Sequence, residues 1–143
     1  MVRVNIIHPR YLADQHLVAE YLEIIMLLSY VRKHPVVESK KMPEDYCLDK
    51  GHIIFFKNKI MYLKKRHELL KKEMRKRGFA AKKSLNCSKI RKELIKDWYA
   101  TKNDKEIIKE RLLWKINKKP NYYRYYGKRR TIEFWKQLIK NAS

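Results

Sequence analysis

The sequence of 143 residues contains 36 lysines and arginines against 15 aspartates and glutamates, a formal net charge of +21. No apolar run is long enough to span a bilayer and no secretory signal opens the chain, so composition argues against a membrane or exported protein. The charge excess predicts a polyanionic partner, usually nucleic acid, and a soluble intracellular protein. The length suits one domain over residues 1–143.

The first predicted helix covers residues 12–32, where apolar side chains recur every three or four positions. Asp14 lies in its first turn or at its cap. His16, Glu20 and Glu23 are spaced i, i+4 and i+7, so they share one face. Apolar neighbours of Glu23 predict a raised pKa that suits proton exchange in a reaction. The alternatives are three solvated polar residues or a metal site, and no further histidine or cysteine completes a metal site.

The second predicted helix runs from about Ile54 to Arg77 and ends at Gly78, after a connection over residues 34–50. Its inward residues are Phe56, Ile60, Leu63, Leu70 and Met74. The other face is strongly basic and carries Lys57, Lys64, Lys65, Arg66, Lys71, Lys72, Arg75 and Lys76. Such a face is either simply solvated or, as we expect with so few acidic neighbours, a surface that contacts phosphates.

Residues 88–98 are predicted to form a short helix or turn, and Asn103 with Glu106 a capping pair for a third main helix that ends before Pro120. The apolar side of that helix is assigned to Ile107, Ile108, Leu112, Trp114 and Ile116. A capped helix over residues 131–140 ends the chain. Cys47 and Cys87 stand alone, which predicts reduced, structural cysteines.

Residues 121–130, NYYRYYGKRR, place four tyrosines among basic side chains. Aromatic rings can stack on exposed bases while neighbouring cations hold phosphates, and each stacked base contributes roughly 1–3 kcal/mol. About half of these tyrosines are expected to cover the first helix instead. The segment is therefore a candidate nucleic-acid contact.

The amino terminus is a candidate nucleophile. Val2 is small enough to permit removal of Met1, which would leave the α-amine of Val2 beside Arg3. An α-amine titrates near ~8, more than two units below lysine, so a larger fraction of it is neutral and nucleophilic at neutral pH.

Several short strings, in this order, resemble the pyrimidine-dimer DNA glycosylase family of the phage endonuclease V type: VRVN, LADQHLVAEYLE, VRKH, GHIIFF, LKKRHELL, KRGF and NYYRYYGK. The resemblance implies a compact all-α domain of three main helices with short helices, to which residues 131–143 add a C-terminal helical extension. It also implies a monomeric repair enzyme that bends double-stranded damaged DNA and flips out a nucleotide, with no cofactor and no metal.

By the same resemblance, the Val2 amine attacks C1′ of the 5′ nucleotide in a UV-induced cyclobutane dimer, displaces the base and leaves a Schiff base, and β-elimination then cuts the 3′ side as an abasic-site lyase. Glu23 is the essential acid. Arg3, Gln15 and His16 line the same pocket. The other DNA-binding candidates are Tyr21, Arg32, Lys33, Tyr122, Tyr123, Arg124, Tyr125, Tyr126 and Lys128.

Two residues depart from the family pattern. Leu22 and Met26 stand where the family has arginines that bind DNA phosphates and orient the carboxylate. If no other residue replaces these two arginines, their absence should weaken lesion binding by roughly a few kcal/mol. The alternatives are a glycosylase for another lesion or an abasic site, and a non-catalytic nucleic-acid-binding protein. The expected location is the cytoplasm, with the nucleoid, or a virus-encoded protein inside a host cell.

Overall fold

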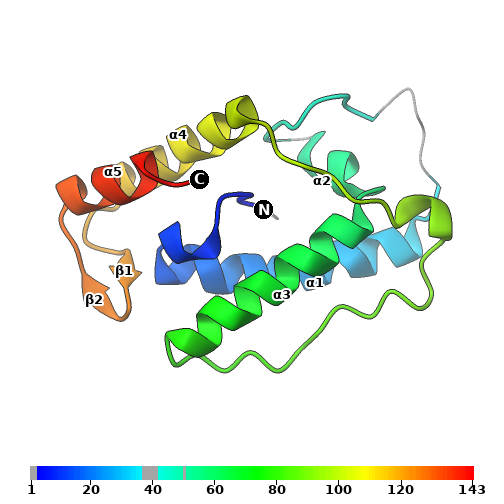
Figure 1. Ribbon diagram of the computed structural model, residues 1–143, viewed down its shortest axis with the longest axis horizontal. Coiled ribbons are helices and arrows are strands. Elements are labelled where there is room, and N and C mark those ends of the chain that lie inside the picture. Colours follow the sequence, from blue (N-terminus) through cyan, green and yellow to red (C-terminus); the bar gives the residue numbers. More distant parts are fainter. Residues whose placement is uncertain (1–2, 37–41, 50) are drawn as a thin grey trace.

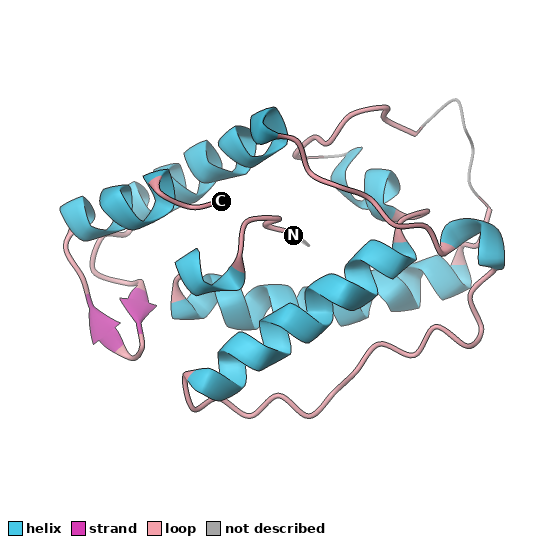
Figure 2. Cartoon of the chain, viewed as in Figure 1, coloured by secondary structure: helices cyan, strands magenta, loops and turns pink. Residues whose placement is uncertain are grey.

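The chain folds into a mostly helical structure, seen here in a computed structural model that describes residues 3–36, 42–49 and 51–143. In chain order the elements are η1 (Pro9–Tyr11), α1 (Asp14–Lys33), α2 (Gly51–Phe56), α3 (Ile60–Lys76), η2 (Lys92–Leu94), α4 (Lys102–Lys118), β1 (Arg124–Tyr125), β2 (Lys128–Arg129) and α5 (Ile132–Lys140). The strands drawn in Figure 2 form one small hairpin, so the predicted all-α class is confirmed.

The helices pack around one hydrophobic core cluster. Each α-helix contributes at least one buried side chain to it, among them Leu17, Phe55, Leu63, Ile108 and Trp135. Figure 1 shows α1 and α3 crossing on one side, α5 folded back on α4 on the other, and the start of the chain between these two pairs. The first described residues, from Arg3 onward, therefore lie between helices from distant parts of the sequence.

The predicted second helix is wrong in one respect, because the structure contains two helices there. The chain leaves helical geometry at Lys59, which has φ −123° and ψ 42°, and α3 begins only at Ile60. The separate orientation of α2 lets His52 point to the start of the chain, where its Nε2 lies 2.7 Å from the Val4 amide nitrogen. The predicted stop at Gly78 is confirmed, since Gly78 has φ +89°, which favours glycine.

The predicted basic face of this helix is also partly wrong. Lys57, Arg66 and Lys71 are buried rather than solvated, at 7%, 3% and 5% exposure. Each uses its charge internally: Lys57 donates to the Val36 carbonyl, Arg66 pairs with Glu20, and Lys71 donates to Ser84. The remaining cations of α3 still form an exposed basic side.

The predicted capping pair of α4 is wrong, and a neighbouring pair forms the cap instead. Thr101 accepts a hydrogen bond from the Asp104 amide, and the Asp104 carboxylate accepts one from the Thr101 amide, a complete capping box. Trp114, assigned to the inner side, is 48% exposed. The predicted cap of α5 is confirmed, because Thr131 accepts from the Phe134 amide.

The hairpin was not predicted. Tyr126 and Gly127 connect β1 to β2 with φ +53° and +76°, and two consecutive positive φ values are typical of a tight hairpin turn. A tyrosine in that conformation is uncommon, and Asp14 holds it there: its carboxylate accepts from the Tyr126 amide at 3.1 Å and the Gly127 amide at 2.7 Å. The first turn of α1 thus fixes the tip of the aromatic and basic segment.

Three smaller predictions concern the loops and cysteines. The connection predicted over 34–50 contains no helix in its described parts, 34–36 and 42–49. The stretch 88–98 contains a turn at residues 88–90 and the short helix η2, so the predicted short helix or turn is confirmed. Both cysteines are free and partly buried, as predicted.

Candidate active site

Three consecutive backbone amides, those of residues 3–5, hold the start of the described chain against α1 and α2. Arg3 donates to the Glu23 carboxylate at 3.0 Å, Val4 to His52 at 2.7 Å, and Asn5 to Glu20 at 3.1 Å. The Tyr46 hydroxyl adds a bond to the Val4 carbonyl at 3.1 Å. The four side chains that make these bonds come from α1, from α2 and from the loop before α2. The tertiary fold therefore sets the position of residue 3.

Glu23 is a half-buried carboxyl group whose pKa is raised, chiefly because burial disfavours its charged form. Its hydrogen bond from the Arg3 amide acts in the opposite direction and lowers the pKa. A carboxyl group with a raised pKa exchanges protons more readily near neutral pH than an ordinary glutamate. This agrees with the raised pKa predicted from its apolar neighbours. Glu20, by contrast, is fully buried in an ion pair with Arg66 and is structural.

Two cations, Arg3 and Lys115 of α4, interact electrostatically with this carboxyl group, and Arg111 of α4 lies near both of them. Burial lowers the pKa of Lys115, and the nearby charges of Arg3 and Arg111 lower it further. Burial likewise lowers the pKa of Arg3, which is 7% exposed, and Arg111 adds to this effect. Arg111 also donates to Asp49 at 3.2 Å. Such a cluster creates a positive potential that attracts phosphate groups.

Lys115 and Arg111 were missed as site residues by sequence reasoning. The sequence places Lys115 on the exposed side of a basic helix, where it resembles its neighbours. Only the packing of α4 beside the start of the chain brings it near Glu23. Lys115 follows Arg111 by four residues, which indicates that both lie on one face of the helix. The sequence does not indicate what that face contacts.

His16 lies at the edge of the same site as a neutral imidazole. Burial lowers its pKa to about 3, and the charges of Lys115 and Arg3 contribute to the shift. Its ring packs on that of Tyr123, with 4.6 Å between centroids. Tyr123 is 8% exposed, so this tyrosine covers α1, as we expect for part of the segment. His16 therefore lies between the charged residues near Glu23 and the segment that leads into the hairpin.

Gln15 fixes the segment that leads into the hairpin. Its amide nitrogen donates to the Tyr122 carbonyl at 2.8 Å, and its amide oxygen accepts from the Arg124 amide at 3.0 Å. Both polar groups of Gln15 are thus used by backbone atoms of that segment. Tyr122 and Tyr126 remain outside at 55% and 39% exposure. Gln15 positions the hairpin rather than pointing free into the pocket.

The other hairpin side chains divide between structure and surface. Tyr125 donates to the Arg10 carbonyl at 2.8 Å, and its ring lies under the guanidinium of Arg77. Arg124 and Lys128 are exposed. Of the predicted DNA-binding residues in this segment, the exposed ones are therefore Tyr122, Tyr126, Arg124 and Lys128, and Arg129 and Arg130 beside them are exposed as well.

Tyr21 is not on the surface, which corrects its assignment as a DNA-binding residue in this conformation. It is 5% exposed, its ring stacks on His67, and its hydroxyl accepts from the Lys83 amide at 2.8 Å. Arg32 and Lys33 are exposed at the end of α1, and Arg32 donates to the Asn86 carbonyl. Val2, the predicted nucleophile, lies outside the described residues.

The two positions that depart from the family pattern lie on the outer side of α1. Leu22 is 45% and Met26 61% exposed. They flank Glu23 in sequence but point away from the core, so the surface next to the site is apolar here. Trp114 on α4, flanked by Arg111 and Lys118, adds a further exposed ring.

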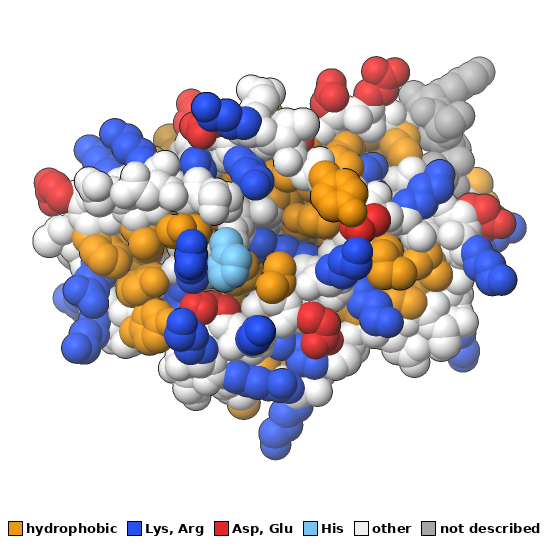
Figure 3. All heavy atoms as spheres, in the orientation of Figure 1, with side chains coloured by type: hydrophobic (Ala, Val, Ile, Leu, Met, Phe, Trp, Pro, Cys, Tyr) orange, Lys and Arg blue, Asp and Glu red, His pale blue; other side chains and the backbone are white. Residues whose placement is uncertain are grey.

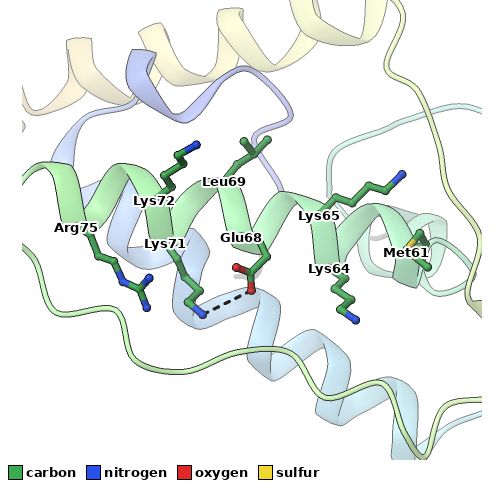
Figure 4. A pocket seen from close by; sticks show the side chains of 8 residues that line it. All are labelled: Met61, Lys64, Lys65, Glu68, Leu69, Lys71, Lys72 and Arg75. Atoms are coloured by element: carbon green, nitrogen blue, oxygen red, sulfur yellow. Dashed lines mark ion pairs between the residues drawn. The ribbon is translucent and has the colours of Figure 1, made fainter.

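A wide hollow of the described surface lies elsewhere, on α3. It has a volume of about 800 Å³, and all the side chains that line it come from α3, as Figure 4 shows. Glu23 does not line it, and an open trough on one helix is less suited to chemistry than the enclosed start of the chain.

Among the described residues, no group of three histidine, cysteine or acidic side chains could hold a metal ion. In the same part of the chain, no helix has the length and apolar character needed to cross a membrane.

A family model described as pyrimidine dimer DNA glycosylase matches residues 1–86. The match contains Glu23 and Arg3 and extends through α1, α2 and α3, while the α4 cations and the hairpin lie beyond it. These residues are more than half of the chain. The protein therefore belongs to the pyrimidine dimer DNA glycosylase family.

Proposed function

We propose that the protein excises the damaged base at a cyclobutane pyrimidine dimer and then cuts the strand as an abasic-site lyase, with the α-amine of Val2 as nucleophile and Glu23 as acid. The observation that supports this most is the hydrogen bond of 3.0 Å from the Arg3 amide to Glu23. One peptide bond joins residue 2 to Arg3, and consecutive α-carbons are about 3.8 Å apart. A chain that begins at Val2 thus has its amine within about one residue length of this bond.

The proposed chemistry balances without a cofactor. The neutral amine forms a bond to C1′ while the C1′–N bond breaks, and the departing base takes the electron pair and a proton. The bound amine then loses one proton, and the C1′–O4′ bond breaks while O4′ takes up a proton, which leaves a protonated imine that acts as the electron sink. Removal of a proton from C2′ then breaks the C3′–O bond and releases the 3′ phosphate. Glu23, with its raised pKa, is suited to carry protons in these steps.

The surrounding side chains suit a DNA duplex. Arg3, Lys115 and Arg111 form the positive pocket around Glu23 and are the groups that take over from the arginines absent at positions 22 and 26. Arg32 and Lys33 at one end of α1, with Arg124 and Lys128 in the hairpin, extend the positive surface. Exposed rings of Tyr122 and Tyr126 offer stacking partners for bases that leave the duplex.

The test is borohydride trapping on a duplex with one thymine dimer, using protein confirmed by intact mass to begin at Val2. Mass spectrometry of the cross-linked peptide then identifies the amine. We expect an adduct on Val2, and none with Glu23→Gln despite normal binding to undamaged DNA. Lys115→Arg is the matched control, because the Lys115 amine lies near Glu23 and has a lowered pKa, so it is the other amine there that could form an adduct. An adduct on Lys115 would reassign the nucleophile.

A further outcome separates catalysis from binding. A protein that binds the dimer duplex but forms no adduct on any amine, and leaves the strand uncut, would overturn the catalytic proposal and leave a binding role. Adducts with a bare abasic site but not with the dimer would assign the chemistry to a different lesion. The exposed Leu22 and Met26 are the residues to examine in that case.

A further inference from the structure

The outer side of α3 carries a trough lined with cations. Its rim consists of Lys64, Lys65, Lys72 and Arg75, with Leu69 between them and Met61 at one end; this is the α3 trough below. Figure 4 shows these side chains projecting from one helix over its whole length, with Glu68 as the acidic residue among them. The corresponding face in Figure 3 shows many lysine and arginine side chains and few acidic ones.

The α3 trough and the N-terminal site face different sides of the molecule. Arg66 and His67 mark the side of α3 that packs on α1, since they contact Glu20 and the Tyr21 carbonyl. At 3.6 residues per turn, Lys65 and Lys72 project from nearly the opposite side of α3. Glu23 lies on α1 and points to the start of the chain and to Lys115 of α4. One duplex lying at Glu23 would therefore leave the α3 trough open.

Most of the charge in the trough is not neutralised within the protein. Lys65 pairs with Asp97 at 2.5 Å, and Glu68 lies 3.5 Å from the buried Lys71. Among the described residues, Lys64 and Lys72 have no acidic group within 4 Å. Arg75 donates only to the Ala81 carbonyl in that same part of the structure. Holding like charges close together costs free energy that a bound polyanion would recover.

The arrangement of cations and apolar groups matches a sugar-phosphate backbone. Leu69 is 43% exposed, and with Met61 it supplies apolar surface between charged residues. From residue 61 to residue 75 the helix rises about 21 Å, and a DNA strand with one phosphate per 3.4 Å presents about six phosphates over that length. Phosphates can then meet the cations while deoxyribose rings contact Leu69 and Met61. Charge alone would attract any polyanion, whereas this alternation favours nucleic acid.

We propose that the α3 trough binds the backbone of a second DNA segment while a first duplex occupies the N-terminal site, so that one molecule bridges two duplexes. The inference rests on the proposed function only in that the N-terminal site binds DNA, and it requires no chemistry there. Holding two segments would let the protein pass from one to the other without fully dissociating.

The test uses two undamaged duplexes. One is immobilised and saturated with protein, and a second, fluorescent duplex is then added and its capture measured. Wild type is expected to capture the second duplex. The double variant Lys64→Glu/Lys72→Glu is expected to lose capture at least tenfold while it still binds the immobilised duplex. The matched control is Lys136→Glu/Lys140→Glu on α5, which makes the same change in net charge at exposed positions and should retain capture.

Four results would overturn the proposal. The first is no capture by wild type, and the second is an equal loss in the α5 control, which would point to net charge alone. The third is weaker binding of the immobilised duplex by the α3 variant, which would mean that the α3 trough is part of the surface that binds the first duplex. Both duplexes are undamaged and capture requires no chemistry, so a failure of the proposed catalysis leaves this test intact. Sedimentation of the complex with one short duplex should show a single protein molecule, because capture through a protein dimer would also contradict the proposal.

Discussion

Arg66 of α3 and Glu20 of α1 form a buried ion pair, with 2.7 Å between Nε and Oε2 and side-chain exposures of 3% and 0%. Glu20 accepts a second bond from the same guanidinium at 3.0 Å and one from the Asn5 amide at 3.1 Å, and Arg66 also donates to the Ile7 carbonyl. The pair therefore joins α1, α3 and the start of the chain. It fixes the segment that begins next to Glu23 although neither residue takes part in the proposed chemistry.

Removing one partner of this pair should destabilise the fold strongly. Arg66→Met leaves the Glu20 carboxylate buried without its counter-charge, and we expect a loss of about 3–5 kcal/mol in the free energy of unfolding. The second substitution Glu20→Gln in that background removes the buried charge and still accepts from the Asn5 amide, so part of the loss should be recovered. Urea unfolding of the wild type and of both variants measures this. A loss below about 1 kcal/mol for Arg66→Met would contradict the assignment.

Asp14 should control the position of the hairpin. It accepts from the Tyr126 and Gly127 amides and pairs with Arg77 Nη1 at 2.9 Å. Asp14→Ala removes all three interactions, and we expect about 2 kcal/mol of destabilisation together with faster amide exchange at Tyr126 and Gly127. Asp14→Asn keeps one acceptor oxygen and should show a smaller effect on both.

Binding to undamaged DNA should weaken in Asp14→Ala more than its stability loss explains, because Arg124 and Lys128 lose their fixed place. Hydrogen exchange followed by NMR and a DNA titration at fixed salt give the two readouts. Unchanged exchange at the hairpin amides of Asp14→Ala would show that the turn is stable by itself.

Apolar periodicity predicted α1 and α5 well, because each buries one continuous stripe. It failed at Lys59, where Phe56 and Ile60 are both buried and continue the helical spacing across the break. The break is set by contacts of α2 with distant residues, such as His52 with the Val4 amide. For α4 the sequence contains two pairs with the spacing of a capping box, Thr101 with Asp104 and Asn103 with Glu106, and the structure uses the first.

The candidate site was predictable only where it lies within one helix. Glu23 and His16 share a face of α1, and their spacing shows this directly. Charge patterns cannot separate Arg66 from Lys64, because both are basic residues on one helix and only the position of Glu20 makes Arg66 internal. Lys115 belongs to the site through the packing of α4 beside the chain start, a relationship between residues far apart in sequence.

His16 should make the protein less stable in mild acid. Its folded-state pKa is lowered to about 3, whereas an unfolded chain has a histidine pKa near ~6.5. Between these values the unfolded chain binds a proton that the folded protein does not, so the free energy of unfolding falls as pH drops through this range. We expect a slope of roughly 1 kcal/mol per pH unit from this residue.

Between pH 7 and pH 5 the free energy of unfolding should therefore fall by about 1–2 kcal/mol less in the variant His16→Gln than in wild type. His34→Gln, at an exposed position, is the matched control and should follow wild type. Urea unfolding at the two pH values measures the difference. An equal loss in His16→Gln and wild type would mean that His16 takes up its proton in the folded state.

Trp114 should report directly on bound DNA. Its indole is 48% exposed, Lys118 Nζ lies 4.0 Å from the ring centroid, and Arg111 of the site lies 5.4 Å away. Of the three tryptophans in the sequence, Trp135 is fully buried and Trp98 is partly buried. A base stacked on Trp114 would quench its fluorescence and contribute roughly 1–3 kcal/mol to binding.

Titration of the protein with a short single-stranded oligonucleotide should therefore quench its fluorescence, and Trp114→Phe should lose most of the quenching. Trp114→Ala should weaken binding about fivefold or more, and Trp114→Phe should weaken it less, because a phenyl ring still stacks. Tyr99→Ala is the control, since Tyr99 is 82% exposed and lies next to Trp98 in sequence. Quenching that persists in Trp114→Phe but disappears in Tyr99→Ala would move the base contact from α4 to the loop that contains Trp98, away from the cations that surround Glu23.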